Sequence, residues 1–367
     1  MKLAWRELVR RPSRFITAGG ALTLIVLLLL VLGGILDALV QGSTGLLKVQ
    51  SAPLIVYSSD SKGSIDRSRV DAAENAAIAA VPGVHEATGL GLALLAGHIP
   101  GQAVPADVAV FGYEAPNLKV PAPPAPGEGY ADTSLQKDGV KLGQTIQLGT
   151  ARNTVKVIGW VKGTDYNLQS GLWVEPSTWQ AALNANIPDA AVQTGTFQAI
   201  LVSTEEGTSP LALEKAIDAA VPGVKALTID EAIAGIPGVT QQSSVFASII
   251  GVTFAVAGIV VALFFALLTI ERIGLLGVLK AVGTSSRTLA AGLTLQAILI
   301  AAGALVVGSL LAFLLSLVIS GTVPITLSLG RFAFTAVGLV ATALVGSAIS
   351  FRRIIRIDPA SAVGEAQ

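Results

Sequence analysis

Several residue types that support chemistry are scarce or missing from this chain. It has no cysteine and only two histidines among 367 residues, so it can form no disulfide and offers no thiol. His85 and His98 have no partners at the spacing of metal ligands, and we interpret both as ordinary surface or turn residues. Neither a GxxxxGK[ST] phosphate loop nor a GxSxG nucleophile elbow occurs. We therefore expect no catalytic residue, no metal site and no cofactor on the chain itself.

Charged residues are also scarce, at 13% of the chain against about a quarter in an ordinary soluble domain. The deficit comes from four long stretches without Asp, Glu, Lys, Arg or His. Because about 20 apolar residues suffice for a helix to cross a bilayer, we predict transmembrane helices at 15–36, 244–270, 288–319 and 332–351. The first run is too long for a signal peptide and no small-residue cleavage site follows it, so we interpret it as an uncleaved helix.

The positions of the basic residues predict how these helices are oriented. The net charge is zero, which gives no case for nucleic acid as a partner. Lysine and arginine gather before the first helix, between the second and third, and after the fourth, whereas the loop before the fourth holds only Arg331. The positive-inside rule places the basic segments in the cytoplasm. We expect a multi-pass protein of the cytoplasmic (cell) membrane, with both termini inside and residues 38–243 outside.

The outer segment, 38–243, is long enough for a core of its own and has an α+β pattern. Apolar or alternating runs predict strands at 54–57, 107–111, 145–148, 155–161 and 199–202. Helices are predicted at about 66–80 and 210–220, and both end in the residues AAVPGV. The Pro-Gly pair ends each helix and leads into a strand, which indicates an internal repeat of two helix–turn–strand units. The proline-rich stretch 116–129 favours extended chain, and we interpret it as the joint between two subdomains.

The predicted membrane helices contain no ionisable residue, and Gln296 is the only side-chain amide in them. Ion-coupled transporters place ionisable groups at membrane depth, where these groups bind and release the coupling ion. The chain is therefore a poor candidate for a proton-driven carrier. If it performs work across a membrane, the energy should come from another subunit.

The segment between the second and third helices, residues 271–287, reads ERIGLLGVLKAVGTSSR. One face of a short helix here is formed by Leu275, Leu276, Leu279 and Val282. Gly283 is suited to end this helix, and Thr284, Ser285 or Ser286 can cap the next one. Two interpretations remain open from the residues alone. The helix is either a connector that rests its apolar face on the bilayer, or an apolar knob that inserts into a groove of a partner, with charges on the rim.

The same segment resembles the hallmark of the FtsX/MacB family of ABC transporter permeases, also called type VII. These proteins carry a phrase close to ER-x-x-E-I-G-V-L-K-A-L-G-A-S-x-R-x-L between their second and third membrane helices. The matching residues are Glu271, Arg272, Gly277, Val278, Leu279, Lys280, Ala281, Gly283, Ser285 and Arg287. Leu275 stands where the family often has a glutamate, so we expect docking here to depend on burial more than on charge.

Three further stretches support the resemblance. LAWRELVRRPSRFITAGGALTLIV at the N-terminus resembles the family's amphipathic first helix, its arginine-rich boundary and its first crossing. DTSLQKDGVKLGQTIQL, followed by VKVIGWV, is similar to the MacB-type periplasmic core domain. FRRIIRIDPASAV resembles the family's closing R-x-x-R-x-x-P-x-x-A-L. The order of one helix, a large outer domain and three helices is also the family topology.

The resemblance implies a membrane protein with four transmembrane α-helices, one and then three, and a large extracytoplasmic α+β domain resembling the MacB periplasmic core domain. In this layout residues 1–14 form a cytoplasmic amphipathic helix, 271–287 the coupling helix, and 352–367 a cytoplasmic tail. The resemblance assigns docking onto an ATPase to Leu275, Leu276, Leu279 and Val282, with Arg272, Lys280 and Arg287 at the rim or on lipid phosphates. Anchoring of the tail at the membrane surface is assigned to Arg352, Arg353 and Arg356.

The implied function is that of a non-enzymatic permease subunit, which couples ATP hydrolysis on a separate cytoplasmic ATPase to movement of the outer domain. ATP and magnesium would bind to that ATPase. Further implied partners are a second permease in a homodimer or a sister subunit, membrane lipid, and an extracytoplasmic protein. Export or extraction of a lipid, peptide or drug-like substrate is the main expectation. The alternatives are a signalling subunit that activates a cell-wall enzyme, uptake of a small solute such as an amino acid, and a receptor without any ATPase.

Overall fold

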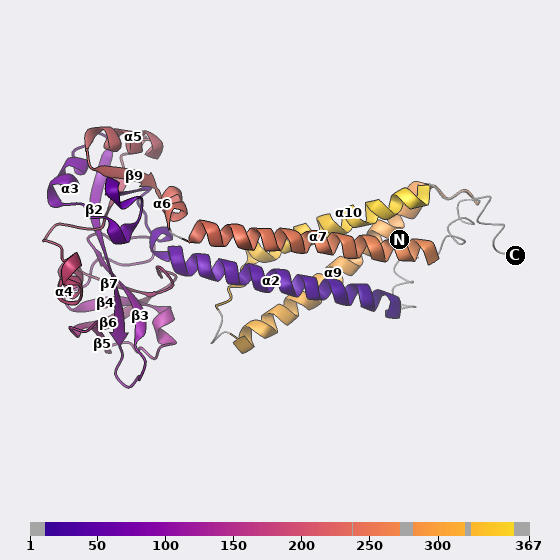
Figure 1. The fold of residues 1–367 in the computed structure, drawn as a ribbon, viewed down its shortest axis with the longest axis horizontal. Coiled ribbons are helices and arrows are strands. Elements are labelled where there is room, and N and C mark those ends of the chain that lie inside the picture. The colour runs from indigo at the N-terminus through magenta and orange to yellow at the C-terminus, as the bar shows by residue number, and fades with distance from the viewer. Residues whose placement is uncertain (1–11, 237, 272–281, 320–323, 356–367) are drawn as a thin grey trace. The chain divides into compact units, whose positions relative to one another are not determined.

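The computed structural model describes residues 12–236, 238–271, 282–319 and 324–355. The chain divides into two compact units, which we call the membrane unit (residues 1–38 and 243–367) and the sheet unit (residues 39–242). Long helices form the first unit, and a mixed sheet with shorter helices forms the second (Figure 1). Most of the predicted amphipathic helix at 1–14 lies outside the described residues.

Four apolar helices run through the membrane unit, and each contains one of the predicted crossings. They are α2 (Pro12–Lys48), α7 (Val239–Glu271), α9 (Ser286–Ile319) and α10 (Leu329–Ile355). All four are long and apolar enough to cross a membrane, which confirms the prediction of one helix followed by three. Helix α2 is longer than its predicted crossing, because it continues from Leu36 to Lys48 and so enters the sheet unit.

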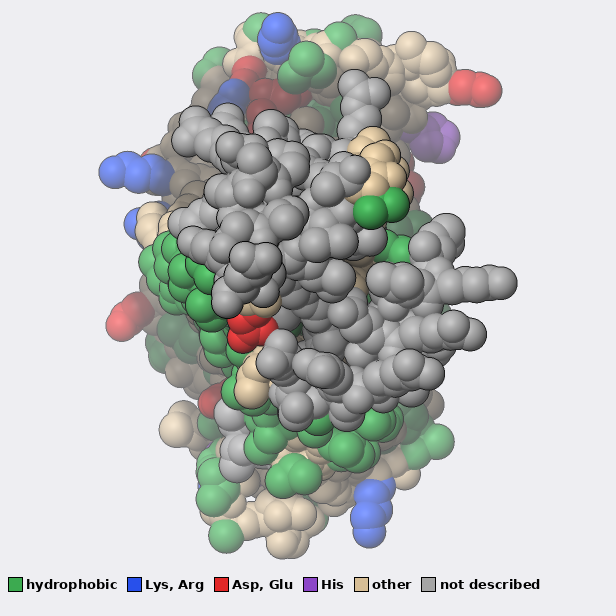
Figure 2. Space-filling model, turned by 90° about the vertical axis from the view of Figure 1, so that its right-hand side faces the viewer, with side chains coloured by type: hydrophobic (Ala, Val, Ile, Leu, Met, Phe, Trp, Pro, Cys, Tyr) green, Lys and Arg blue, Asp and Glu red, His purple; other side chains and the backbone are tan. Residues whose placement is uncertain are grey.

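Small residues let the four helices pack closely. A Cβ atom added to Gly308 of α9 would lie 2.7 Å from a Val26 methyl group of α2, and one on Gly346 of α10 would lie 2.8 Å from Val261 of α7. Close backbone approach of this kind stabilises helix pairs in lipid, where apolar burial gives little driving force. Large apolar side chains cover much of the remaining helix surface. On the face of the molecule in Figure 2, green side chains gather at the left and below the grey atoms.

The sheet unit contains nine strands in one hydrogen-bonded sheet, in the order β3-β7-β4-β6-β5-β2-β8-β1-β9. The five strands predicted by range correspond to β1, β3, β5, β6 and β8, and the strands predicted after the two AAVPGV segments correspond to β2 and β9. Strands β4 and β7 were not predicted. The strands are β1 (Leu54–Ser58), β2 (Val84–His98), β3 (Ala106–Tyr113), β4 (Glu128–Asp132), β5 (Thr145–Leu148), β6 (Asn153–Val161), β7 (Ser170–Val174), β8 (Ala199–Thr204) and β9 (Val224–Thr228).

One end of the sheet has the ferredoxin-like βαββαβ arrangement. It consists of β1, α3 (Ala72–Ala79), the first part of β2, β8, α5 (Pro210–Ala220) and β9, with the antiparallel strand order β2-β8-β1-β9. The two AAVPGV segments occupy equivalent places after α3 and α5. Gly83 and Gly223 both adopt a φ of +95°, which favours glycine, so the repeat predicted from the sequence is confirmed.

The rest of the sheet is inserted between β2 and β8. Its pairings close into a ring, because β2 pairs with β3, β3 with β7, β7 with β4, β4 with β6, β6 with β5, and β5 again with β2. Helix α4 (Pro176–Asn186) places Trp179 against Gly91 of β2 and Gly112 of β3, where an added Cβ would lie 2.3 and 2.6 Å from the indole. The two glycines therefore make room for this buried ring.

Two expectations for this unit are wrong in detail. The proline-rich stretch 116–129 joins β3 to β4 inside the ring, so it is not the joint between the subdomains. The helix predicted at 66–80 begins only at Ala72 as α3. Asp71 accepts a hydrogen bond from Glu74 N at 2.8 Å, and the Glu74 carboxylate accepts one from Asp71 N at 2.9 Å. This capping box fixes the start of the helix, and a separate turn of 3₁₀ helix, η2 (Ile65–Arg67), precedes it.

Candidate coupling sites

The predicted coupling helix falls largely on residues 272–281, so Arg272, Leu275, Leu276, Leu279 and Lys280 lie outside the described residues. The end of the segment is described. Val282 is 80% exposed and Gly283 adopts a φ of +98°, as expected of a glycine that ends a helix. Ser285 Oγ then accepts a hydrogen bond from Thr288 N at 3.2 Å. Of the three residues predicted to cap the next helix, Ser285 is therefore the one that caps α9.

Three of the remaining predicted site residues lie at the start of α9 and at the end of α10, which are the ends that we predict to face the cytoplasm. Arg287 is in the first turn of α9, and Arg352 and Arg353 are in the last turns of α10. Arg356 lies outside the described residues. These positions at helix ends do not test the predicted contacts of the arginines with lipid and with an ATPase, which stay predictions.

An ion pair that the sequence did not predict joins α2 to α10. Arg331 Nε donates to Asp37 Oδ2 at 3.1 Å, and Arg331 Nη2 pairs with Asp37 Oδ1. Ser328 Oγ donates to Asp37 Oδ2 at 3.3 Å and accepts from Arg331 N at 3.1 Å, so it also caps α10. The Arg331 and Asp37 side chains are only 16% and 29% exposed. A two-point contact of this type fixes the direction of both side chains.

Two glycines of α2 let the chain before α10 lie directly against this helix. A Cβ added to Gly33 would lie 2.5 Å from Arg331 Cδ, and one on Gly34 would lie 2.9 Å from Ile325 Cγ2. Thr326 N also donates to Gly34 O at 3.0 Å. We call this set of contacts between Gly33–Asp37 and residues 325–331 the helix clamp. The sequence signal for it was the lone arginine of this loop and the lone acid at the end of the first apolar run.

A second set of contacts, within the sheet unit, holds the last part of α2. The loop at 163–169 bonds to the helix through its backbone: Leu46 N donates to Asp165 O and Leu168 N donates to Gly42 O, both at 3.0 Å. A Cβ added to Gly45 would lie 2.7 to 2.8 Å from backbone atoms of Asp165 and Gly163. Glycine at position 45 is therefore required for the loop to reach the helix backbone. We call this contact the loop clasp.

Two carboxylates stand behind the loop clasp. Asp132 is buried, and its Oδ2 accepts hydrogen bonds from both Thr164 N and Thr164 Oγ1 at 2.8 Å. Asp165 Oδ1 accepts one from Ser134 Oγ at 2.9 Å. Burial raises the pKa of Asp165 from its ordinary 3.8 to about 6, and the neighbouring Asp132 carboxylate adds to the rise. The loop that holds α2 therefore contains a carboxyl group that titrates near neutral pH.

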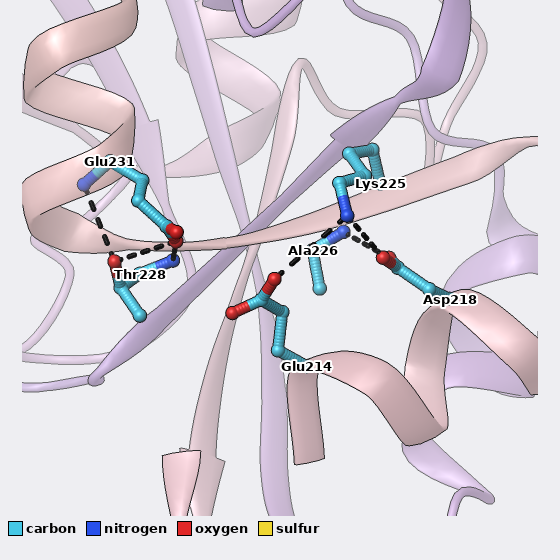
Figure 3. A network of polar contacts seen from close by, with 6 residues as sticks. All are labelled: Glu214, Asp218, Lys225, Ala226, Thr228 and Glu231. Carbon is cyan, nitrogen blue, oxygen red and sulfur yellow. Dashed lines mark hydrogen bonds and ion pairs between the residues drawn. The ribbon is translucent and has the colours of Figure 1, made fainter. Parts of the chain in front are cut away.

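The open edge of the sheet, β9, is protected by acidic side chains (Figure 3). Ala226 N donates to Asp218 Oδ1 at 2.8 Å, and Thr228 N donates to Glu231 Oε2 at 2.9 Å. Lys225 forms ion pairs with Asp218 and, at 3.8 Å, with Glu214. Unpaired backbone N–H groups at a sheet edge attract further strands. Carboxylates that occupy these two groups keep the edge from pairing.

Both histidines lie on β2, His85 exposed and His98 half-buried. Among the described residues, no group of three His, Cys, Asp or Glu side chains is arranged to hold a metal ion.

Several solved structures are similar to this chain. The periplasmic region of MacB from Actinobacillus actinomycetemcomitans is 12% identical with a TM-score of 0.35, covering 52% of this chain and 94% of that one. The extracellular domain of the ABC-type transporter YknZ from Gram-positive bacteria is 13% identical with a TM-score of 0.34, covering 48% of this chain and 99% of that one.

Comparison with known sequences gives relatives along the whole chain. A protein of Staphylococcus haemolyticus named as a putative hemin transport system permease, HrtB, is 25% identical over 382 residues, covering 99% of each chain. Its namesake from Staphylococcus epidermidis is 24% identical over 254 residues, or 69% of this chain and 68% of the relative. An uncharacterized ABC transporter permease of Mycobacterium tuberculosis is 27% identical over 246 residues, or 66% of this chain and 63% of the relative.

A family model agrees with these relatives and covers the last three helices. Residues 247–359 match the FtsX-like permease C-terminal family, a range that contains most of α7, the connector between α7 and α9, and the whole of α9 and α10. The four apolar helices, the mixed α+β unit between the first and second of them, and the permease relatives agree with the resemblance found in the sequence. Residues 247–359 therefore form an FtsX-like permease C-terminal domain, and the chain is a membrane protein related to ABC transporter permeases.

Proposed function

We propose that this permease transmits movement of a separate cytoplasmic ATPase to its own sheet unit, which lies outside the cell membrane. The ATPase binds ATP and magnesium and hydrolyses ATP, and the permease itself catalyses no reaction. The chain acts as a dimer, with an identical copy or a sister permease. Both termini and the connector between α7 and α9 face the cytoplasm, in agreement with the basic residues at these places.

The observation that carries this proposal is the continuity of α2. It is one helix from Pro12 to Lys48, and residues 39–48 of it belong to the sheet unit. Within that unit the loop clasp bonds to the helix backbone at Gly42 and Leu46. A displacement of the membrane part of α2 along its axis therefore acts directly on the sheet through a hydrogen-bonded contact.

The absence of ionisable residues from the spans supports an external energy source. Between the ends of the described helices, the apolar spans carry no carboxylate that could bind a coupling ion. Movement of the outer unit serves to export or extract a lipid, peptide or drug-like molecule. Because relatives from two staphylococcal species carry the name hemin transport permease, hemin is the first substrate to test.

The ATPase contact is tested by replacing a residue of the apolar face of the coupling helix. We expect Leu279→Asp to abolish capture of the ATPase that co-purifies with the wild-type chain, because a carboxylate cannot enter an apolar groove without a partner. Lys280→Ala, on the rim, is the matched control and should keep the complex, since rim charges contribute little. Membrane insertion is checked in both variants. A Leu279→Asp chain that inserts and still binds the ATPase would show that the coupling helix is wrongly assigned.

A further inference from the structure

We infer that Asp37 and Arg331 are positioning residues for this transmission, because their ion pair makes α10 and α2 move together. This inference rests on the proposed function. It concerns the helix clamp, which lies wholly within the membrane unit, and it assigns the clamp a part in coupling beyond that of holding four helices together.

The distribution of charge in the membrane unit is the first reason. The described helices of this unit carry only seven charged residues: Arg14, Asp37, Glu271, Arg287, Arg331, Arg352 and Arg353. Five of them lie at the helix ends that we place on the cytoplasmic side. The remaining two, one acid and one base, lie at the opposite ends of α2 and α10, and they bond to each other. Among the described helices of this unit, Asp37 and Arg331 are thus the only charged residues at the ends away from the cytoplasm, and they pair with each other.

The geometry of the contact is the second reason. Arg331 is in the first turn of α10, whose other end leads into the basic tail assigned to the cytoplasmic surface. Asp37 is in α2 just before the helix passes into the sheet unit. The contact is also reinforced by the backbone bond from Thr326 to Gly34 and by the Ser328 hydroxyl. A shift of α10 along its axis therefore pulls on α2 at the last turns before the outer unit begins.

Steric fit gives the third reason. The Arg331 stem lies over Gly33, where an added methyl group would be 2.5 Å from its Cδ. By contrast, a Cβ on Gly20 of the same helix would meet no atom within 4 Å. Only glycine at position 33 leaves room for the arginine stem. Comparing Gly33→Ala with Gly20→Ala therefore separates loss of this contact from the general effect of alanine on the helix.

The test uses the whole permease with its ATPase in lipid nanodiscs. Because the chain has no cysteine, Leu142→Cys in the sheet unit, where the leucine is 61% exposed, can carry a single fluorescent label. The change in label emission on adding ATP and vanadate is the measure of transmission. It is recorded for the otherwise wild-type chain, Asp37→Asn, Gly33→Ala, the conservative variant Asp37→Glu, and the control Gly20→Ala. Basal ATP hydrolysis and the yield of complex are measured in parallel.

We expect Asp37→Asn and Gly33→Ala to lower the label response roughly tenfold, within the range typical of coupling between sites. Gly20→Ala and Asp37→Glu should keep it within about twofold, as expected for changes that spare the contact. Basal hydrolysis should stay within about twofold in every variant, because the ATPase contact is untouched. A purely structural pair would instead lower yield and hydrolysis together.

Two results would contradict the inference, and they differ. A wild-type response that survives in both Asp37→Asn and Gly33→Ala would overturn the role of the clamp while leaving the proposed function intact. A wild-type complex that hydrolyses ATP without any response of the label would overturn the proposed transmission, and the inference with it. If one of the two variants fails to assemble, the other decides, since one changes charge and the other only shape.

Discussion

The titration of Asp165 makes the loop clasp sensitive to pH, and the sign can be derived from the structure. The pKa of this carboxyl is about 6 in the folded chain and 3.8 when exposed, so the folded state holds the proton more tightly. Stability therefore falls as the pH rises from about 4 to about 6, because the unfolded chain ionises first. Above pH 6 the folded state bears the full free-energy cost of the ionised Asp165 carboxylate, and below pH 4 this cost vanishes.

The size of the effect follows from the same two values. A rise of the pKa from 3.8 to about 6 corresponds to about 3 kcal/mol, and partial solvent screening of the half-buried group reduces this to about 2 kcal/mol. Asp165→Asn removes the charge and keeps an oxygen to accept the hydrogen bond of Ser134. We expect the variant to be about 2 kcal/mol more stable than the wild type at pH 7.5 and equally stable at pH 4.

Tryptophan fluorescence during denaturant unfolding is the appropriate assay. Three of the four tryptophans, Trp160, Trp173 and Trp179, lie in the sheet unit, and two of them are fully buried. The full-length chain in detergent is unfolded between pH 4 and pH 8, and Asp60→Asn, at an exposed aspartate, serves as control. A stability difference between Asp165→Asn and wild type that does not change with pH, or that grows toward pH 4, would refute the reasoning.

Two further substitutions test the contacts described above. Gly45→Ala should destabilise the sheet unit by about 1–3 kcal/mol in the same fluorescence assay, because the added methyl meets backbone atoms of Asp165 and Gly163, whereas Gly42→Ala meets only a flexible Leu168 methyl and should cost less. Equal effects of the two changes would contradict the steric argument. The pair Asp218→Ala and Glu231→Ala should free two N–H groups of β9 and produce self-association, seen by light scattering, that Asp230→Ala does not produce. If the molar mass of the chain with both substitutions equals that of the wild type, these two carboxylates are not what prevents β9 from pairing.

The sequence predicted best those features that depend on local composition. The four helices follow from apolar runs that admit no other structure of that length, and the repeated AAVPGV follows from the need for glycine at one backbone angle. Ser285 was among three predicted caps because only a short polar side chain before α9 can bond to its free N–H groups. Each of these requirements is satisfied by residues within a few positions of one another.

The features that the sequence did not predict are those made between distant segments. Asp37 and Arg331 lie 294 positions apart, and either charge taken alone is typical of an ordinary helix end. The length of β2 was not predicted, because this strand pairs with β8, β3 and β5 in succession, so its two faces change surroundings and its apolar pattern is irregular. Such pairings become visible only when the whole sheet is present.

The two contacts on α2 differ in kind, and the difference suits a transmitting helix. Beside the backbone bond from Thr326 to Gly34, the helix clamp uses the Asp37–Arg331 ion pair, which can open without a change in the backbone of either helix. The loop clasp uses backbone hydrogen bonds at Gly42 and Leu46, with Gly45 making room for the loop, so these bonds depend on no side chain that could rotate away. Helix α2 is therefore held by backbone bonds to the sheet unit and by an ion pair to α10. Under strain the ion pair can open before the sheet is distorted. We therefore expect overload of the system to break the Asp37–Arg331 pair first, while the loop at 163–169 stays bound to α2.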